Sequence, residues 1–252
     1  MIILKKISKK IFEIAKKLLD YFSKGELLLW LFSVTLITVS FFVFGGNGAL
    51  TLIASLIGVT SILINAKGNP IGQLLMIAFS LLYGIISYSF SYYGEMITYL
   101  GMTMPMAVFA LISWLRHPHA GRRSEVKVNS VSRTEAYLMF LAAAIVTGIF
   151  YFILRYFNTA NIIPSTVSVT TSFLAVYLTF RRDPRFGLAY AANDVVLIIL
   201  WTLASLADSR YISVTVCFAA FFINDIYGFI SWQKRKSRQE RDAKAKSKAE
   251  AA

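Results

Sequence analysis

Two aspartates stand inside long apolar runs of this chain, and both follow an asparagine. Asp194 lies in "AANDVV" and Asp225 in "FINDIY", after Asn193 and Asn224. An acid at the centre of a membrane-spanning helix costs about 2.5–3.5 kcal/mol on insertion scales, so it needs a partner or a purpose. Carboxylates accept hydrogen bonds from hydroxyl-bearing solutes. We therefore expect both acids to face one cavity. The two amides are candidates for the same cavity, or they bond neighbouring helices to one another.

Asp194 also belongs to a stripe of inward-facing positions. Gly187, Tyr190, Asp194, Leu197 and Trp201 recur every three or four residues, which places them on one face of a helix. This face combines a hydrogen-bond acceptor with aromatic rings. Such a wall suits a flat, hydroxyl-bearing solute that stacks on Tyr190 or Trp201 while Asp194 accepts its hydrogen bonds.

Two apolar runs earlier in the chain add weaker candidates. Tyr83 stands in a stretch rich in Tyr, Phe and Met, and Gln73 lies one turn inside its run. Gln73 either bonds a solute at the mouth of the site or caps its own helix, and both alternatives stay open. Glu95 opens the next run, where a carboxylate at the outer surface suits a helix N-terminus. Pro105 in that run frees a backbone carbonyl and predicts a kink.

The sequence predicts no metal or cofactor and argues against an enzyme. Cys217 is the only cysteine, and the methionines have no His or Cys companion in the apolar runs. Two membrane aspartates invite comparison with aspartyl proteases that share a proton between carboxylates. The GxGD pattern of the intramembrane enzymes is missing here, and no run contains HExxH or a Ser/His pair. A purely structural scaffold stays open as an alternative, and it would show no dependence on a solute.

Composition identifies the class of protein. Of the 252 residues, 57% are hydrophobic and 15% charged, and mean hydropathy is +0.62. A soluble domain has about 45–50% apolar residues. A membrane span needs about 20 apolar residues, and runs such as 27–45 do not alternate as barrel strands do. The sequence therefore predicts an all-α, polytopic membrane helical bundle. Its eight predicted spans are 27–45, 49–66, 70–92, 95–115, 134–158, 162–180, 184–206 and 210–232.

The charges predict the orientation of this bundle. Eight spans place both termini on one side, and only Arg155 and Arg210 of the 26 Lys and Arg residues then lie toward the other. Because basic loops stay in the cytoplasm, we expect both termini to be cytoplasmic in the plasma membrane. The net charge of +13 then reflects retention signals and contacts with the lipid bilayer, with no role in nucleic-acid binding.

The two ends of the chain differ from the transmembrane domain, which covers residues 27–233. Residues 1–26 alternate lysines with apolar residues at helical spacing, which predicts an amphipathic segment on the cytoplasmic membrane surface. Residues 234–252 are basic and have no apolar face, so they predict a disordered tail.

Two pairs of motifs indicate an internal repeat. "GNPIGQ" (68–73) and "RDPRFG" (182–187) each place a capping residue before a proline at the first helical position. "FALISWLRH" (109–117) and "YGFISWQKR" (227–235) close the following spans. We expect parallel three-helix repeats at about 49–115 and 162–232, joined by a linker helix at 134–158 and preceded by one extra helix. Parallel repeats are typical of transporters, with the site between them near the midplane.

The block 69–118, which begins "NPIGQLLMIAFSLLYG", and the closing "FFINDIYGFISW" resemble the nicotinamide riboside transporter (PnuC) family. The resemblance runs from about residue 49 to 235. It implies a bacterial inner-membrane facilitator of vitamin-like nucleosides, with a full-length SWEET-like bundle that assembles as a homotrimer. It also implies transport without ATP or an obligatory ion, and trapping of the solute by a cytoplasmic kinase.

The chain departs from the family at one motif. The riboside-binding pattern WxxWxxxN falls here on Gly187, Tyr190 and Asp194, so both tryptophans and the asparagine are replaced. Related branches carry thiamine, riboflavin or deoxynucleosides, and these solutes stay open beside nicotinamide riboside. A proton-coupled carrier is a further alternative, since Asp194 and Asp225 in a dry cavity could take up protons.

Overall fold

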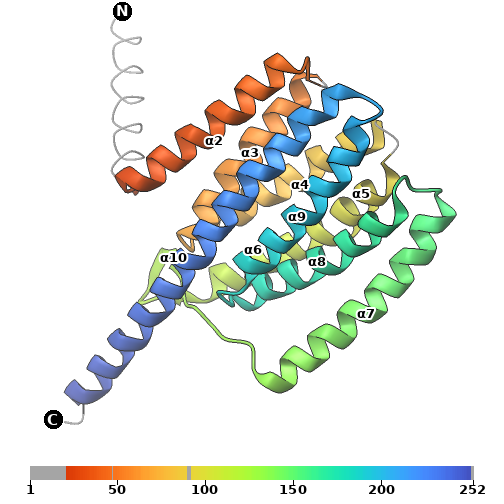
Figure 1. Cartoon of the computed structure of the whole chain (residues 1–252). Coiled ribbons are helices and arrows are strands. Elements are labelled where there is room, and N and C mark those ends of the chain that lie inside the picture. The colour runs from red at the N-terminus through yellow and green to blue at the C-terminus, as the bar shows by residue number, and fades with distance from the viewer. Residues whose placement is uncertain (1–20, 47, 90–91, 251–252) are drawn as a thin grey trace, which may run out of the picture.

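The computed structural model describes residues 21–46, 48–89 and 92–250 and forms an elongated helical bundle (Figure 1). Within that part of the chain, 8 helical segments are long and apolar enough to cross a membrane, which confirms the predicted all-α bundle. Each lies close to its predicted range, except that the last is much longer. They are α2 (Lys24–Val43), α3 (Ala49–Ala66), α4 (Ile71–Ser89), α5 to α6 (Tyr93–Arg116), α7 (Arg133–Tyr156), α8 (Ile162–Arg181), α9 (Phe186–Ser205) and α10 (Ile212–Glu250).

The two proline motifs start their helices in the same way. The Oδ1 atom of Asn69 accepts a hydrogen bond from the backbone N–H of Ile71 at 3.0 Å, where α4 begins. The Oδ1 atom of Asp183 likewise accepts from the N–H of Arg185 at 2.9 Å, just before α9. A side-chain acceptor thus satisfies a backbone donor that each new helix leaves unpaired.

The fourth span is interrupted where the sequence predicts a kink. It consists of α5 (Tyr93–Thr98), a π-helical turn η1 (Tyr99–Thr103) and α6 (Met104–Arg116). Pro105 has no N–H to give to the preceding turn, and a π-helical turn accommodates the missing hydrogen bond. The interruption shifts the side chains of the turn relative to those of a regular helix.

Reciprocal hydrogen bonds join the half that contains α3 to α6 with the half that contains α8 to α10. Trp114 on α6 donates from its indole nitrogen to the carbonyl of Thr179 on α8 at 2.9 Å. Trp232 on α10 donates in the same way to the carbonyl of Asn65 on α3 at 2.8 Å. The serine before each tryptophan bonds the next carbonyl on the same partner helix. The last helix of each half is therefore held to the first helix of the other.

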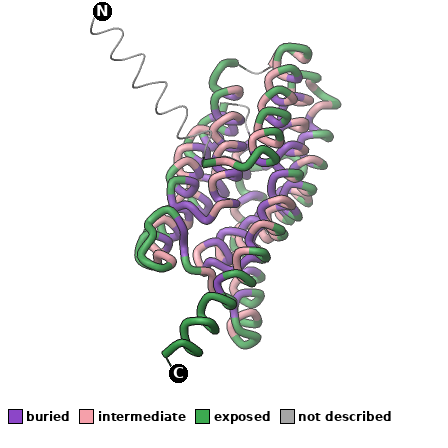
Figure 2. The backbone as a smooth tube through the Cα atoms, turned by 90° about the vertical axis from the view of Figure 1, so that its left-hand side faces the viewer, coloured by how far each residue is buried: buried purple, intermediate pink, exposed green. Residues whose placement is uncertain are grey.

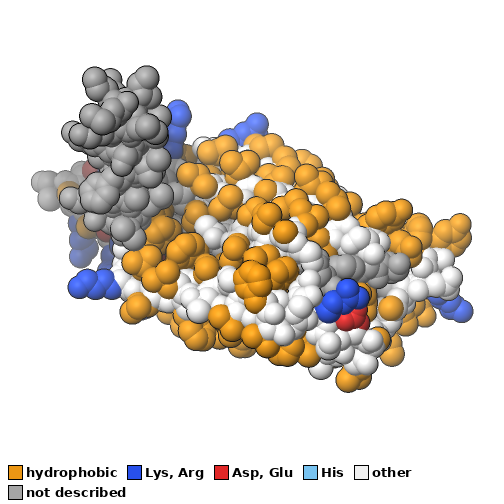
Figure 3. All heavy atoms as spheres, turned by 90° about the horizontal axis from the view of Figure 1, so that it is seen from above, with side chains coloured by type: hydrophobic (Ala, Val, Ile, Leu, Met, Phe, Trp, Pro, Cys, Tyr) orange, Lys and Arg blue, Asp and Glu red, His pale blue; other side chains and the backbone are white. Residues whose placement is uncertain are grey.

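Hydrophobic side chains cover most of the surface seen in Figure 3, as expected where lipid is the solvent. The linker helix α7 packs mainly against α8 and stands apart from the rest of the bundle in Figure 1. It exposes large side chains such as Phe140, Leu141 and Phe152.

The C-terminal segment differs from the predicted disordered tail, because α10 continues as one helix to Glu250. Figure 2 shows this end of α10 leaving the bundle as an exposed rod. Ala, Lys, Arg and Glu have high helix propensity, which the prediction from missing apolar residues neglected. The helix is also anchored by Gln239, which donates to the carbonyl of Val126 at 3.0 Å and accepts from the N–H of Val128 at 2.8 Å. The predicted segment 1–26 lies mostly outside the described residues.

Val126 ends a short hairpin that the sequence analysis did not predict, formed by β1 (Pro118–His119) and β2 (Arg122–Val126). The hairpin and the residues after it cross the end of the bundle at which α3, α6 and α8 end, which we call the basic end. Here the N–H of Val126 donates to the carbonyl of Gly68, and the N–H of Asn129 to the carbonyl of Arg182. The loop thereby ties the two halves together.

Candidate functional site

A narrow cavity lies between the two halves of the bundle. Its volume is about 30 Å³, room for little more than a water molecule or two. Helices of both halves contribute to it. The lining residues are Gly58, Ile62, Asn65, Met76, Phe79, Tyr99, Thr103, Ser172, Phe186, Tyr190, Asn193, Asp194, Phe218, Phe221 and Asp225.

Both predicted aspartates line this cavity. Asp194 is 3% exposed and Asp225 4% exposed, and their carboxyl groups are close neighbours across the cavity. The Oδ2 atom of Asp194 has no hydrogen-bond partner among the described residues. Since buried polar atoms are nearly always bonded, a free acceptor on a cavity wall is a feature that a ligand donor would satisfy.

The two asparagines have different surroundings. Asn193 lines the cavity, and its Oδ1 atom accepts hydrogen bonds from the hydroxyls of Thr171 at 2.8 Å and Ser172 at 3.0 Å, both on α8. Asn224 instead donates to the hydroxyl of Ser33 on α2 at 2.8 Å and is not a lining residue. Asn224 therefore serves to join neighbouring helices. The side-chain oxygen of Asn193 does the same, although Asn193 also lines the cavity.

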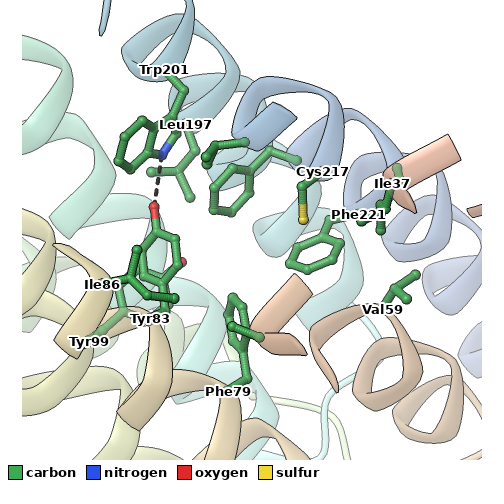
Figure 4. Packing of buried hydrophobic residues seen from close by; sticks show 14 of the residues in the cluster. Ile37, Val59, Phe79, Tyr83, Ile86, Tyr99, Leu197, Trp201, Cys217 and Phe221 are labelled. Atoms are coloured by element: carbon green, nitrogen blue, oxygen red, sulfur yellow. Dashed lines mark hydrogen bonds between the residues drawn. The ribbon is translucent and has the colours of Figure 1, made fainter. Parts of the chain in front are cut away.

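Tyr83 and Trp201 lie next to the cavity and not in its wall. The indole N–H of Trp201 donates to the hydroxyl of Tyr83 at 2.8 Å (Figure 4). The two residues line a separate space of about 10 Å³. Phe79 and Phe218 line both spaces and so form the partition between them. The structure thus stacks the candidate aromatic residues along the bundle in two levels, with Tyr190 at the level of the acids.

Gln73 also stays outside the lining but touches a residue that the sequence analysis missed. Its side-chain nitrogen donates to the Oδ1 atom of Asn65 at 2.8 Å, and Asn65 lines the cavity. The helices α3 and α4 lie close together here, as Gly72 shows: a Cβ atom on this glycine would lie only 2.2 Å from the same oxygen of Asn65. The sequence did contain a signal for Asn65, since a lone amide in an apolar run is the same pattern that singled out Asn193.

The prediction that Glu95 lies at the outer surface is wrong, because its side chain is 1% exposed. The loop between α7 and α8 covers the start of α5, and a Cβ atom on Gly94 would lie 2.7 Å from the side chain of Thr159. Ser168 of α8 is a polar neighbour of the buried carboxyl group. The position of this loop depends on tertiary packing, which the local sequence around Glu95 does not encode.

Gly187 marks a contact between backbones. A Cβ atom at this position would lie 2.7 Å from the backbone nitrogen of Phe229 and 2.9 Å from the carbonyl oxygen of Asp225. Here α9 and α10 touch, so no side chain larger than that of glycine has room at this position. The aromatic rings that α9 itself contributes to the cavity wall are those of Phe186 and Tyr190, whose centroids are 6.3 Å apart.

The cavity therefore combines two acids, two amides, hydroxyl groups and aromatic faces. Such a set can hold a small polar molecule with flat and hydroxylated parts. The volume of about 30 Å³ is far below the roughly 300–1,000 Å³ of pockets that bind drug-sized ligands. Binding a solute of nucleoside size thus requires the surrounding side chains or the two halves to move apart.

Comparisons with known proteins agree with this arrangement. The family model described as "Nicotinamide mononucleotide transporter" matches residues 48–234. The chain is 24% identical over 214 residues to a nicotinamide riboside transporter PnuC of Neisseria mucosa, covering 83% of this chain and 81% of the relative. It is also similar in fold to a crystal structure of the vitamin B3 transporter PnuC. The TM-score is 0.76 at 23% identity, covering 86% of this chain and 94% of that one.

Proposed function

The chain belongs to the nicotinamide mononucleotide transporter family and is a multi-pass membrane transporter, and on that premise we propose that it facilitates the passage of nicotinamide riboside or a closely related nucleoside or vitamin. The observation that carries this proposal is the cavity between the two halves, with Asp194 and Asp225 in its wall. The N. mucosa relative with that riboside in its name supports the choice of solute.

The chemistry of the cavity favours the unphosphorylated solute over the mononucleotide. Nicotinamide riboside combines a cationic ring with ribose hydroxyls, and both features suit a pair of carboxyl groups. The rings of Phe186 and Tyr190 offer faces for the flat heterocycle. A phosphate would meet like charge at Asp194 and Asp225 in a site of low dielectric constant, where repulsion is strong.

The solute is tested by titration of the purified protein in detergent with nicotinamide riboside, thiamine, riboflavin and a deoxynucleoside. We expect micromolar binding of one of the four, with nicotinamide mononucleotide as the charge control that binds at least tenfold more weakly. Binding of thiamine, riboflavin or the deoxynucleoside alone would assign the chain to another branch. No binding of any of the four would refute the proposal.

Proton coupling is a second candidate mechanism, and one observation favours it. The carboxyl groups of Asp194 and Asp225 are buried together with no basic partner among the described residues. A pair of this kind can take up and release a proton as the solute binds and leaves. Uptake into proteoliposomes separates the two mechanisms. A facilitator gives uptake that an uncoupler leaves unchanged, whereas a proton-coupled carrier stops when the pH gradient is removed.

Facilitation alone cannot concentrate a solute, so the proposal includes a cytoplasmic kinase that phosphorylates the solute and thereby prevents its return. The orientation belongs to the same proposal, with the basic end and both termini in the cytoplasm and the protein in the plasma membrane. The clustering of Lys and Arg at that end supports it. The parallel-repeat arrangement is likewise proposed, and the reciprocal bonds of Trp114 and Trp232 support it.

A homotrimer completes the proposal, with α7 in the contact between subunits. This helix exposes Ala144 and Gly148 one turn apart, and a Cβ atom on Gly148 would meet nothing within 4 Å. Small residues at this spacing let membrane helices approach closely. We expect light scattering in detergent to give a trimer, and Gly148→Leu to shift it toward the monomer. A monomeric wild type would remove the trimer and leave the transport proposal intact.

A further inference from the structure

One face of α10 changes character where the helix leaves the bundle. Ile223, Tyr227 and Ile230 are followed at the same three- to four-residue spacing by Lys234, Arg238 and Arg241. Ile223 is 43% exposed and Ile230 46% exposed. Because α10 is continuous from Ile212 to Glu250, these positions share one side of a single rod. The stripe is apolar where α10 packs on the bundle and basic where α10 extends beyond it.

A surface hollow of about 460 Å³ lies where the stripe changes. Tyr227 and Ile230 line its end next to the bundle. The basic residues that line it are Lys234, Arg235, Arg238 and Arg241. The hollow is therefore apolar at one end and strongly basic at the other.

The acids near this hollow do not neutralise its charge. Glu125 pairs with Arg235 at 2.8 Å and also with Arg238, so one carboxylate serves two guanidinium groups. Within the described residues, no ion pair involves Lys234 or Arg241. Two full positive charges at the hollow thus have no acidic partner in the described chain.

Neighbouring helices fix the depth of the hollow relative to the membrane. Ser231 donates to the carbonyl of Ala66, the last residue of α3, so α10 passes the end of the bundle at this level. Lys234 lies three residues further on, about 4.5 Å along the axis at the usual rise of a helix. Apolar side chains therefore lie at the depth of acyl chains and basic ones at the depth of phospholipid headgroups.

We propose that this hollow binds one anionic phospholipid of the phosphatidylglycerol type. Its phosphate diester contacts Lys234 and Arg241, which form no ion pair within the described residues, and an acyl chain follows Ile230 and Ile223 along α10. Basic pockets on the cytoplasmic side of membrane helices suit such headgroups. Charged hydrogen bonds from ammonium and guanidinium groups to phosphate oxygens supply the specificity.

The test measures lipid bound to the full chain by native mass spectrometry and the melting temperature in mixed micelles. Phosphatidylcholine alone is compared with phosphatidylcholine plus phosphatidylglycerol. We expect phosphatidylglycerol to bind and raise Tm in the wild type, and the double variant Lys234→Gln, Arg241→Gln to lose about tenfold in affinity. The matched control Lys244→Gln, Lys248→Gln removes the same charge from the same helix beyond the hollow. It should bind as the wild type does.

Three results would overturn the proposal. Equal losses in both double variants would show attraction by net charge without a site. A rise in Tm with inorganic phosphate that equals the rise with the lipid would assign the hollow to a free phosphate. No response of the wild type to phosphatidylglycerol would remove the site altogether. Solute binding is measured on the same samples, so failure of the lipid site and failure of the transport proposal are distinguishable.

Discussion

The acids at the basic end and the acids inside the bundle have opposite surroundings. At the basic end each described acid of the bundle and its hairpin has a basic partner. The pairs are Glu26 with Lys67, Glu125 with Arg235, Glu135 with Arg181 and Asp183 with Arg185. Asp194, Asp225 and Glu95 in the interior have none within the described residues. An acid that pairs with a base joins neighbouring helices. A buried acid without a base lowers the stability of the fold. Where such a costly acid also lines the cavity, as Asp194 and Asp225 do, it indicates a role toward a solute.

The largest effect that separates the two groups is expected at Asp183, which is 1% exposed. Its carboxylate accepts hydrogen bonds from the N–H of Val131 at 2.7 Å and from the side chain of Arg185 at 2.7 Å and 2.8 Å. Asp183→Ala leaves these donors unpaired, so we expect a loss of about 3–5 kcal/mol, or roughly 10 °C in Tm. Thermal unfolding in detergent measures it, and solute affinity of the folded fraction should stay that of the wild type. A large loss of solute affinity in Asp183→Ala would contradict the purely structural role of the acids at the basic end.

Asp194→Asn is expected to show the reverse pattern. The change removes a charged acceptor from the cavity wall but keeps its shape, and hydrogen bonds to charged groups contribute about 1.5–3 kcal/mol. We expect solute affinity to fall about 10- to 100-fold while Tm and oligomer size change little. Calorimetric titration measures the affinity, and a melting curve on the same sample measures the stability. Wild-type affinity in this variant would exclude Asp194 from the site.

Low pH should weaken the basic end through the same acids. Burial by itself would raise the pKa of Asp183, but hydrogen bonds from Arg185 and from the backbone of Val131 outweigh it and hold the pKa below its ordinary value of 3.8. The pKa of Glu125 is also lowered, because Arg235 and Gln239 outweigh its burial. A pKa that is lower in the folded state gives stability that is present above the unfolded value and is lost as pH falls through the folded one.

We therefore expect Tm to fall as the pH is lowered through about 4, and to fall less steeply in Asp183→Asn, where one titrating group is gone. The loss should be smaller than that of Asp183→Ala, since protonation keeps one oxygen as an acceptor. Identical slopes in the variant and the wild type would remove Asp183 as a cause.

The smallest effect is expected for Glu95→Gln. No basic group pairs with this buried carboxyl in the described chain, so the amide of the same size replaces it without breaking an ion pair. We expect a stability change below about 1 kcal/mol, within the range of ordinary hydrogen-bond replacements. Glu26→Gln is the matched control, since it separates a carboxylate from Lys67 at 2.8 Å and should lower Tm more. A larger loss at Glu95 than at Glu26 would reverse the comparison.

The sequence predicts the spans well because hydropathy and helix caps are local properties. The runs at 49–66 and 162–180 match α3 and α8 to within a residue, and both proline motifs start their helices as expected. Burial of the stripe with Asp194 also follows from local spacing. Other features depend on which helix is the neighbour. Asn224 faces α2, and Glu95 lies under a distant loop. Periodicity gives the face of a helix that carries a residue but not the element packed against it.

The contact at Gly187 limits how the solute site can change. Beside the cavity, α9 and α10 are in backbone contact at this position, since a Cβ atom on Gly187 would lie 2.7 Å from the nitrogen of Phe229. Any larger residue at this position therefore needs α10 to lie further from α9. A substitution of Gly187 would thus displace a helix and, with it, Asp225 in the cavity wall. The shape of the solute site thus depends on the spacing of two helices as well as on the side chains that line it.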